Sequence, residues 1–332
     1  MTGQITPSTG AANASVLGVG AYRPRRVVTN AEILEHIDST DEWIQTRSGI
    51  KERRWADPDE TVLMMATNAA NEALVESGVD PAQIGCVIVA TVTHLYQTPA
   101  IATQIAVAVG APTAAAFDIS AACAGFCYGI AMASDLIRGG SASYVLVIGV
   151  ERLSDITDRT DRGTAFIFAD GAGAAVVGPS EQPGIGPVVW GSDGTQHYAI
   201  SQKESWQEAA GSYSWPNLRM DGNPVFRWAS FEMAKTAQQA LDVAGVKAED
   251  LDLFIPHQAN MRITDAMRRA LKLPEHVKVA RDIERQGNTS AASVPLAIAA
   301  MRESGEAGSG DLALIIGFGA GLVFAAQVIR LP

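Results

Sequence analysis

The chain has 332 residues, of which 47% are hydrophobic and 18% are charged, and its formal net charge is −11. That length is ample for a large core, and the acidic balance argues against a general binder of nucleic acid or anionic membranes. Three cysteines in so long a chain argue against a disulfide framework and indicate a reducing compartment, so we expect a cytoplasmic protein.

The N-terminal segment MTGQITPSTGAANAS has no basic start followed by an apolar stretch, so it does not resemble a signal peptide. Downstream, amphipathic patterns alternate with short apolar runs. We expect helices that include 61–77, 123–138 and 229–244, and strands that include 86–92, 143–149 and 312–317. Alternation of this kind predicts an α/β protein with largely parallel sheets covered by helices.

The chain repeats itself at a nearly constant spacing. Residues 73–84 (ALVESGVDPAQI) match 240–251 (ALDVAGVKAEDL) at an offset of 167, and 140–149 (GSASYVLVIG) match 308–317 (GSGDLALIIG) at an offset of 168. Helix–turn–strand units look alike in many α/β proteins, but several matches near one offset favour an internal duplication.

A third match, SAAC at 120–123 with SAAS at 290–293, lies between the other two. We therefore divide the chain into two related halves, residues 1–178 and 179–332. No low-complexity linker separates them, so we expect the halves to share one core.

The segment FDISAACAGFCYG places Cys123 among small residues at the expected start of a helix. Unpaired N–H groups and the helix dipole favour a thiolate there, and can lower a cysteine pKa from about 8.5 to roughly 3.5–7.5. Cys86, inside a strand, and Cys127, one turn into the helix, have the ordinary interpretation of buried packing residues. Cys123 is therefore the candidate nucleophile. Its spacing to other Cys or His residues matches no zinc site, and we expect no metal.

Two polar residues are candidate partners of this cysteine. The apolar strand LDLFI ends in PHQAN, which places His257 at the carboxyl end of a strand, where α/β sheets bind ligands. Asn288 lies in GNTSAAS, which alone indicates a turn or helix cap, but in the duplicated arrangement this loop corresponds to the loop of Cys123. Both residues should face the same centre.

The apolar run from Leu312 to Ile329 is long enough to suggest a transmembrane helix. Three glycines and Gln327 interrupt it, so we predict two buried strands joined by a glycine turn, and no membrane partner. The turn, GFGAG at 317–321, lacks the surroundings of a dinucleotide fingerprint. Its glycines would instead let backbone N–H groups approach an oxyanion.

Taken together, AACAGF, PHQAN and GNTSAAS stand in the order and spacing found in the β-ketoacyl-acyl carrier protein synthase III family, which the chain resembles along nearly its whole length. Actinobacterial members look most similar. The resemblance implies the thiolase fold: two duplicated halves, five α-β-α-β-α layers and a homodimer. It also implies an acyltransferase that initiates fatty acid synthesis and needs no cofactor.

By this resemblance, Cys123 takes the acyl group of an acyl-CoA primer and holds it as a thioester. Malonyl-acyl carrier protein then loses CO2, and its enolate attacks the acyl-enzyme. His257 and Asn288 would stabilise the enolate, each contributing about 3–4 kcal/mol by analogy with other oxyanion holes. The backbone N–H groups of Cys123 and Ala320 would stabilise the oxyanion of acyl transfer. Many relatives have glycine at position 320, but a main-chain contact tolerates alanine.

Other roles follow from the resemblance residue by residue. Residues that match contacts to CoA are Trp43, Arg47, Arg162 and Asn260. Those that match a basic patch for the acidic carrier protein are Arg227, Arg262 and Arg269, although scattered arginines are often simply solvated. Thr98, supplied by the partner subunit, and Phe168 match the acyl pocket. Some relatives have a bulky aromatic residue at position 98, so threonine predicts branched or medium-to-long primers.

Several alternatives share parts of this pattern. A secondary-metabolism priming ketosynthase or acyltransferase of the same fold is the nearest. A degradative thiolase fits less well, because Gly317 stands where that class has a second cysteine, and the motifs also differ from those of chalcone-synthase-like enzymes. A Cys–His–Asn hydrolase uses the same residue types without a malonyl donor. A dinucleotide-binding protein rests on GFGAG alone.

Overall fold

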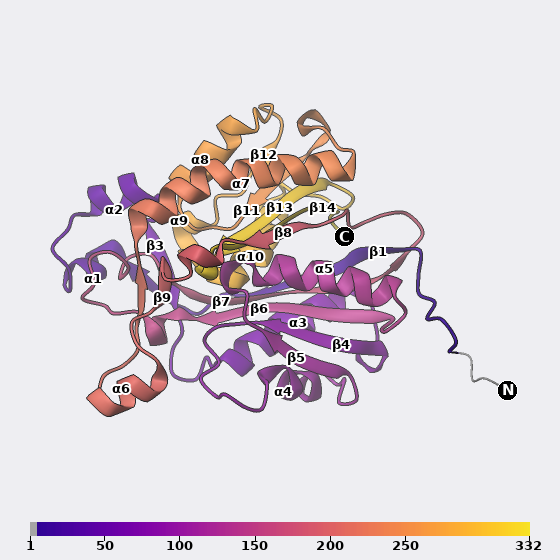
Figure 1. The fold of residues 1–332 in the computed structure, drawn as a ribbon, viewed down its shortest axis with the longest axis horizontal. Helices are drawn as coiled ribbons and strands as arrows, with labels where there is room; N and C mark the ends of the chain where they lie inside the picture. The colour runs from indigo at the N-terminus through magenta and orange to yellow at the C-terminus, as the bar shows by residue number, and fades with distance from the viewer. Residues whose placement is uncertain (1–4) are drawn as a thin grey trace.

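Two five-stranded mixed sheets form the frame of the molecule, and the computed structural model describes residues 5–332 of the chain (Figure 1). The first sheet has the strand order β1-β7-β6-β4-β5. Its strands are β1 (Asn13–Tyr22), β4 (Ile84–Ala90), β5 (Ala115–Ile119), β6 (Tyr144–Arg152) and β7 (Asp170–Ser180). β7 runs antiparallel to both of its neighbours, whereas β6, β4 and β5 are parallel.

The second sheet has the same plan. Its order is β8-β14-β13-β11-β12, with β14 antiparallel to both neighbours and β13, β11 and β12 parallel. The strands are β8 (Val189–Ser192), β11 (Leu253–Pro256), β12 (Lys278–Val279), β13 (Leu312–Gly319) and β14 (Val323–Arg330). The matching topology supports the predicted duplication. The boundary at residue 178 stays a prediction, and β7 continues two residues past it.

Helices cover the sheets and separate them, which gives the five α-β-α-β-α layers of the thiolase fold (Figure 1). α5 (Gly125–Arg138) and α10 (Ser293–Glu303) form the central layer between the sheets. The outer layers are α3 (Val62–Ser77) with α4 (Ile101–Ala108) on the first sheet, and α7 (Gly222–Ala244) with α8 (Met261–Ala270) on the second.

Alternate residues of each strand face different layers. In β4, Cys86 and Ile88 pack against the central helices, whereas Val87 and Val89 pack against α3 and α4. Side chains of a strand alternate between the two faces of its sheet, so a sheet covered on both sides requires a continuous apolar run. The central core contains residues of both halves, including Phe126 of α5. One hydrophobic core therefore contains residues from both sheets.

The remaining elements gather at one end of the layers, on the left in Figure 1. They are β2 (Arg26–Thr29), α1 (Asn30–Leu34), α2 (Asp41–Ser48), β3 (Glu52–Trp55), β9 (Ile200–Gln202), α6 (Trp206–Ser212), β10 (Leu218–Met220) and α9 (Ile283–Gln286). Seven short 3-10 turns lie elsewhere along residues 5–332. Three of these turns lie near Cys123: η2 (Ala122–Ala124), η6 (Ser290–Ala292) and η7 (Ala320–Leu322).

Some expected boundaries differ from those of the structure. The apolar run at the C-terminus is two paired strands, β13 and β14, as predicted. No helix within residues 5–332 is long and apolar enough to cross a bilayer. α7 begins at Gly222 instead of residue 229, because Pro224 lies in its first turn, where a missing N–H is tolerated. α5 begins at Gly125, after η2, instead of at Cys123.

The expected pairing of SAAC with SAAS is also displaced. η2 and η6 are equivalent turns, and each begins with a residue in the left-handed region: Ala122 with φ 43° and Ser290 with φ 48°. Ala122 therefore corresponds to Ser290, at the offset of 168 seen elsewhere, and Cys123 corresponds to Ala291. The two SAA strings are similar because both turns need small residues, but they are two residues out of register.

β6 approaches η6 so closely that only glycine fits at position 149. A Cβ atom there would lie 2.3 Å from the carbonyl oxygen of Ala291. We expect Gly149→Ala to lower the free energy of unfolding by about 1–3 kcal/mol, because strand and turn must separate. Urea unfolding checks this. Gly211→Ala, in α6 with open space around it, is the control and should change stability by less than about 1 kcal/mol.

Candidate active site

Cys123 lies in η2, at the end of α5 that faces the loop between β13 and β14. The backbone at the end of β13 packs directly against the cysteine. A Cβ atom at Gly319 would lie 2.8 Å from both the sulfur and the amide nitrogen of Cys123, and one at Gly317 would lie 2.8 Å from its carbonyl oxygen. The GFG segment therefore packs around the cysteine of the other half, which explains why this strand ends in glycines.

The pKa of the Cys123 thiol is raised, whereas the sequence predicted a lowered pKa. Burial raises the pKa of its thiol to about 12, while hydrogen bonds from Ser290 and from its own backbone amide act in the opposite direction. The prediction of a lowered pKa at the helix start is therefore wrong for the resting protein, because the loss of solvation dominates. The thiol is protonated at neutral pH, and acyl transfer requires a group that takes its proton.

His257 follows β11 and is buried. Its backbone N–H donates to the carbonyl of Ile316 at 2.7 Å, and its ring contacts Phe318 edge-on at 5.3 Å between centroids. Burial lowers the pKa of His257 to about 3, so the imidazole is neutral at physiological pH. A neutral imidazole has one N–H donor and one acceptor nitrogen.

Ser293 determines which nitrogen carries the proton. Its Oγ lies 2.6 Å from Nδ1 of His257 and accepts the backbone N–H of Gln258 at 3.4 Å. Within residues 5–332 the Ser293 hydroxyl has no other hydrogen-bond acceptor in reach than Nδ1, so we infer that its proton is donated there. The Nε2 atom of His257 then carries the N–H. The ring is therefore a hydrogen-bond donor toward the cavity and has no free acceptor.

Asn288 is held by an isolated parallel bridge to Phe168. Its backbone N–H donates to the carbonyl of Ile167 at 2.9 Å, and its carbonyl accepts from Ala169 at 2.9 Å. The side-chain Oδ1 accepts the N–H of Ser290 at 2.9 Å. With its oxygen occupied in this way, the amide of Asn288 presents its NH2 group as a donor.

The strand partner of Asn288 is itself fixed by β3. The guanidinium of buried Arg53 donates to the carbonyl of Phe166 at 2.9 Å, and the indole N–H of Trp55 donates to the carbonyl of Phe168 at 3.0 Å. Burial lowers the pKa of Arg53 to about 10, and the guanidinium remains charged at neutral pH. An element far away in sequence thus positions the active-site amide.

Two cavities meet at Cys123. One, of about 1010 Å³, is lined by residues of the 91–100 segment, by Phe168 and by Ala320. The other, of about 300 Å³, is lined by His257 and Asn288 and opens toward Trp43. Cys123 and Phe168 line both cavities. The structure therefore brings the predicted cysteine, histidine and asparagine together at the junction of two cavities.

The residues matched to CoA contacts gather at the mouth of the smaller cavity. Trp43 lies near two guanidinium groups, that of Arg47 at 5.8 Å and that of Arg162 at 5.3 Å from its ring centroid. Asn260 lines the cavity, but its amide caps α8 through Arg262 and donates to the carbonyl of Arg47 at 2.9 Å. Its side chain is thus mainly structural in this state.

The three arginines of the expected docking patch are exposed on α7 and α8, which pack against each other. Arg262 lies beside the cavity mouth, 4.6 Å from the ring centroid of Phe226. None of the ion pairs found within residues 5–332 includes Arg227, Arg262 or Arg269. Thr98 is exposed, and its neighbours 94–97 line the larger cavity.

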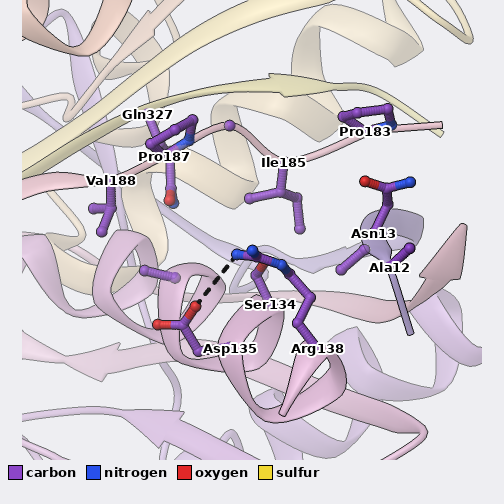
Figure 2. A pocket seen from close by; sticks show the side chains of 13 residues that line it. Ala12, Asn13, Ser134, Asp135, Arg138, Pro183, Ile185, Pro187, Val188 and Gln327 are labelled. Carbon is purple, nitrogen blue, oxygen red and sulfur yellow. Dashed lines mark ion pairs between the residues drawn. The ribbon is translucent and has the colours of Figure 1, made fainter. Parts of the chain in front are cut away.

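A separate hollow of about 250 Å³ lies at the other end of α5 (Figure 2). It is lined by residues of that helix, of β1 and of the 183–188 connection, and Arg138 there forms an ion pair with Asp135 at 3.8 Å. It contains none of the candidate catalytic residues. Within the part of the chain that the structure describes, no group of three His, Cys, Asp or Glu side chains is placed to hold a metal.

Sequence reasoning missed several residues of this site. Ser293 hydrogen-bonds with His257, and the backbone N–H of Ser290 donates to Asn288. Glu151 is fully buried and accepts the hydroxyl of Thr91, which lines the larger cavity. Ser290 and Ser293 were visible only as small residues of the GNTSAAS motif. Glu151 lies near the end of β6, directly after GV, and a single carboxylate at a strand end was the only sequence signal available.

Comparisons with known proteins agree with this geometry. The family model described as 3-oxoacyl-[acyl-carrier-protein] synthase III matches residues 117–194, and the model of its C-terminal part matches residues 241–331. The β-ketoacyl-[acyl-carrier-protein] synthase III 1 of Streptomyces coelicolor is 58% identical, with 99% of each chain covered.

Solved structures extend the likeness to three dimensions. A priming β-ketosynthase of a polyketide biosynthetic pathway superposes with a TM-score of 0.96 at 49% identity, covering 99% of both chains. The 3-oxoacyl-[acyl-carrier-protein] synthase III of Aquifex aeolicus superposes with a TM-score of 0.89 at 39% identity, covering 96% of this chain and 100% of the other.

The fold and the cysteine–histidine–asparagine site define a thiolase-fold condensing enzyme of the acyltransferase class. Within that class, the chain belongs to the β-ketoacyl-[acyl-carrier-protein] synthase III family.

Because the pKa of His257 is lowered, we expect the free energy of unfolding to depend on pH. The ordinary pKa of histidine is 6.5. As the pH falls below that value, His257 becomes protonated in the unfolded chain, whereas in the folded protein it stays neutral until about pH 3. The free energy of unfolding should therefore fall by about 2 kcal/mol more in the wild type than in His257→Gln between pH 7.5 and pH 5. Urea unfolding at both pH values measures this. Equal losses in the two proteins would show that His257 titrates normally.

Proposed function

We propose that the enzyme joins an acyl-CoA primer to malonyl-acyl carrier protein with loss of CO2, the reaction that initiates fatty acid synthesis. This proposal rests on one observation. Cys123 lies where two cavities join, together with two neutral hydrogen-bond donors, His257 and Asn288. A nucleophile beside two such donors suits a reaction that forms an acyl-enzyme and then an enolate. No cofactor is required.

In the first half-reaction, the Cys123 sulfur attacks the thioester carbonyl of the primer, and CoA leaves as its thiolate. The oxyanion of the tetrahedral intermediate would be stabilised by the backbone N–H groups of Cys123 and Ala320, where the glycine contacts bring η7 against η2. The acyl chain would occupy the larger cavity, past Phe168.

In the second half-reaction, the malonyl thioester enters through the smaller cavity, loses CO2 and becomes an enolate. Its oxygen would accept hydrogen bonds from Nε2 of His257 and from the amide of Asn288. Both donors are neutral and buried, so neither of them holds the malonyl carboxylate by charge, which would oppose its loss as CO2. The enolate carbon then attacks the acyl thioester, which releases Cys123 and the β-ketoacyl product.

Peripheral residues complete the proposal. Trp43 and Arg162 would sandwich the CoA adenine, with Arg47 near the nucleotide phosphates and Asn260 beside the pantetheine arm. Exposed arginines on α7 and α8 would guide the acidic carrier protein to the same opening, at positions Arg227, Arg262 and Arg269.

We also propose a homodimer that acts in the cytoplasm. β5 is an edge strand with partly exposed residues, and the nearby 94–100 segment exposes Leu95 (41%) and Tyr96 (74%). Unpaired sheet edges and exposed apolar side chains favour association. A partner that covers this region would close the larger cavity and place its own Thr98 there.

A second candidate, a ketosynthase that primes a polyketide pathway, has a specific observation in its favour. The solved priming β-ketosynthase superposes with a TM-score of 0.96 over 99% of both chains. The chemistry would be the same, and the pathways would differ in the acyl carrier protein that is used. Condensation with a fatty acid carrier protein and with a polyketide carrier protein, measured side by side, separates the two.

Single-turnover assays with radiolabelled acyl-CoA test the proposed reaction. We expect a stable acyl-enzyme and CO2 release that depends on malonyl-acyl carrier protein, both lost in Cys123→Ala. His257→Ala and Asn288→Ala should still release CoA in a burst, because their donors act on the enolate. Their condensation rates should fall by about 10²–10³ each. Hydrolysis of acyl-CoA without malonyl dependence would contradict the proposal.

Thr98→Phe tests the identity of the primer. With threonine, we expect branched or medium-to-long acyl-CoA to be used, and the larger aromatic side chain should exclude them while acetyl-CoA still reacts. A primer scan of kcat/KM for both proteins measures this. A wild type that uses acetyl-CoA far faster than isobutyryl-, octanoyl- or longer acyl-CoA would make the prediction wrong.

A further inference from the structure

Glu151, near the end of β6, is a fully buried carboxyl group. Its Oε2 atom accepts the hydroxyl of Thr93 at 2.7 Å, the backbone N–H of Val92 at 3.1 Å and the hydroxyl of Thr91 at 3.3 Å. The Thr93 oxygen in turn accepts the backbone N–H of Arg152 at 2.8 Å. Burying a carboxyl group is unfavourable unless donors surround it. Here the donors belong to three consecutive residues, so the group holds one short segment, 91–93.

Residues 91–93 need this support because the strand before them has ended. The backbone ladder between the parallel strands β4 and β6 ends where Ala90 lies opposite Gly149. Beyond it, the backbone N–H of Val92 donates to the Glu151 side chain instead of to a neighbouring strand. A backbone N–H that is removed from water needs an acceptor. A side chain of β6 therefore continues the connection to the chain that leaves β4.

The segment that Glu151 holds forms part of the larger cavity. Thr91 and Val92 line that cavity together with Cys123, and residues 94–97, which follow, line it as well. Glu151 itself lines neither the larger nor the smaller cavity. It can therefore affect a bound acyl group only through the segment that it holds.

A second carboxyl group anchors the other end of this wall. Asp118 of β5 accepts the backbone N–H groups of Ile101 at 2.8 Å and of Ala102 at 2.9 Å, where α4 begins. Between the two anchors, residues 95–99 are exposed. The position of this stretch therefore depends largely on the carboxyl groups at its ends, and Glu151 is the buried one of the two.

We propose that Glu151 is a positioning residue that fixes this wall of the larger cavity and so determines how efficiently long primers react. The role rests on the proposed function, in which the larger cavity takes the acyl chain. An acetyl group reaches only the part of the cavity beside Cys123, whereas a longer chain extends along the wall. A displacement of about 1 Å can cost about 10²-fold in rate. Loosening the wall should therefore slow the reaction of long primers far more than that of acetyl-CoA.

The test is the ratio of kcat/KM for octanoyl-CoA to kcat/KM for acetyl-CoA, measured with malonyl-acyl carrier protein as the second substrate. Both values come from one sample, so the ratio does not depend on the fraction of the enzyme that is folded. In Glu151→Ala we expect the ratio to fall by about 10-fold or more. The KM for malonyl-acyl carrier protein should change by less than about threefold, because residues 91–97 do not line the smaller cavity.

Two further variants test whether the hydrogen bonds fix the wall. Glu151→Gln retains an oxygen that can take the place of Oε2 and accept the same three hydrogen bonds, so the ratio should stay within about threefold of the wild type. Thr93→Val removes the shortest of these bonds with little change in volume, and it should lower the ratio even if Glu151→Ala does not fold. A fall in Glu151→Gln as large as that in Glu151→Ala would contradict the proposal.

Glu60→Ala is the matched control. Glu60 is also fully buried and lines neither cavity, and its carboxyl group accepts hydrogen bonds from Tyr22, Arg25 and Asp57. Its loss should lower the stability of the protein but leave the ratio unchanged. A wild-type ratio in folded Glu151→Ala and Thr93→Val, or an equal fall of the ratio in Glu60→Ala, would overturn the proposal.

Mass spectrometry of the acyl-enzyme separates the failure of this role from that of the proposed function. Acylation by octanoyl-CoA needs no malonyl donor and reports on Cys123 directly. A wild type that forms no acyl-enzyme would contradict the proposed function itself. A wild type that is acylated and condenses, with an unchanged ratio in the variants, would contradict only the role of Glu151.

Discussion

Gly319 and Gly149 bring the backbones of the two halves into direct contact, one against Cys123 and the other against Ala291. These contacts join the end of β13 to η2 and the end of β6 to η6. Every candidate catalytic group lies on or beside one of these four segments. A side chain at either glycine would push a strand end away from a turn, so the geometry of the site depends on two positions without a Cβ atom.

Close packing at this junction also determines the protonation states. Burial raises the pKa of the Cys123 thiol, lowers that of the His257 imidazole and raises that of the Glu151 carboxyl. All three shifts favour the neutral form, as desolvation requires. A site of neutral groups suits a reaction that handles negative charge on the substrate, first as an oxyanion and then as an enolate. It also means that the nucleophile has to be activated during the reaction.

Much of this arrangement could be predicted from the sequence, because its signals are local or repeated. The matches at offsets of 167 and 168 predicted two similar halves, and the sheets do have the same order and directions. Strand ends and small-residue turns singled out Cys123, His257 and Asn288, and the structure brings them to one place. The helix start near Cys123 was also visible, but its expected effect on the pKa was outweighed by burial that no sequence pattern reveals.

What the sequence could not predict are contacts between segments that are distant in the chain and chemically ordinary. Arg53 reaches Phe166, and through that strand the position of Asn288 is fixed, although 113 residues separate the first two. Ser293 orients His257 across 36 residues. Glu151 is one acidic residue among 36, and only the fold shows that it is fully buried against Thr91 and Thr93. The motifs thus identify the candidate catalytic groups, whereas the groups that orient them become visible only when the two halves are packed together.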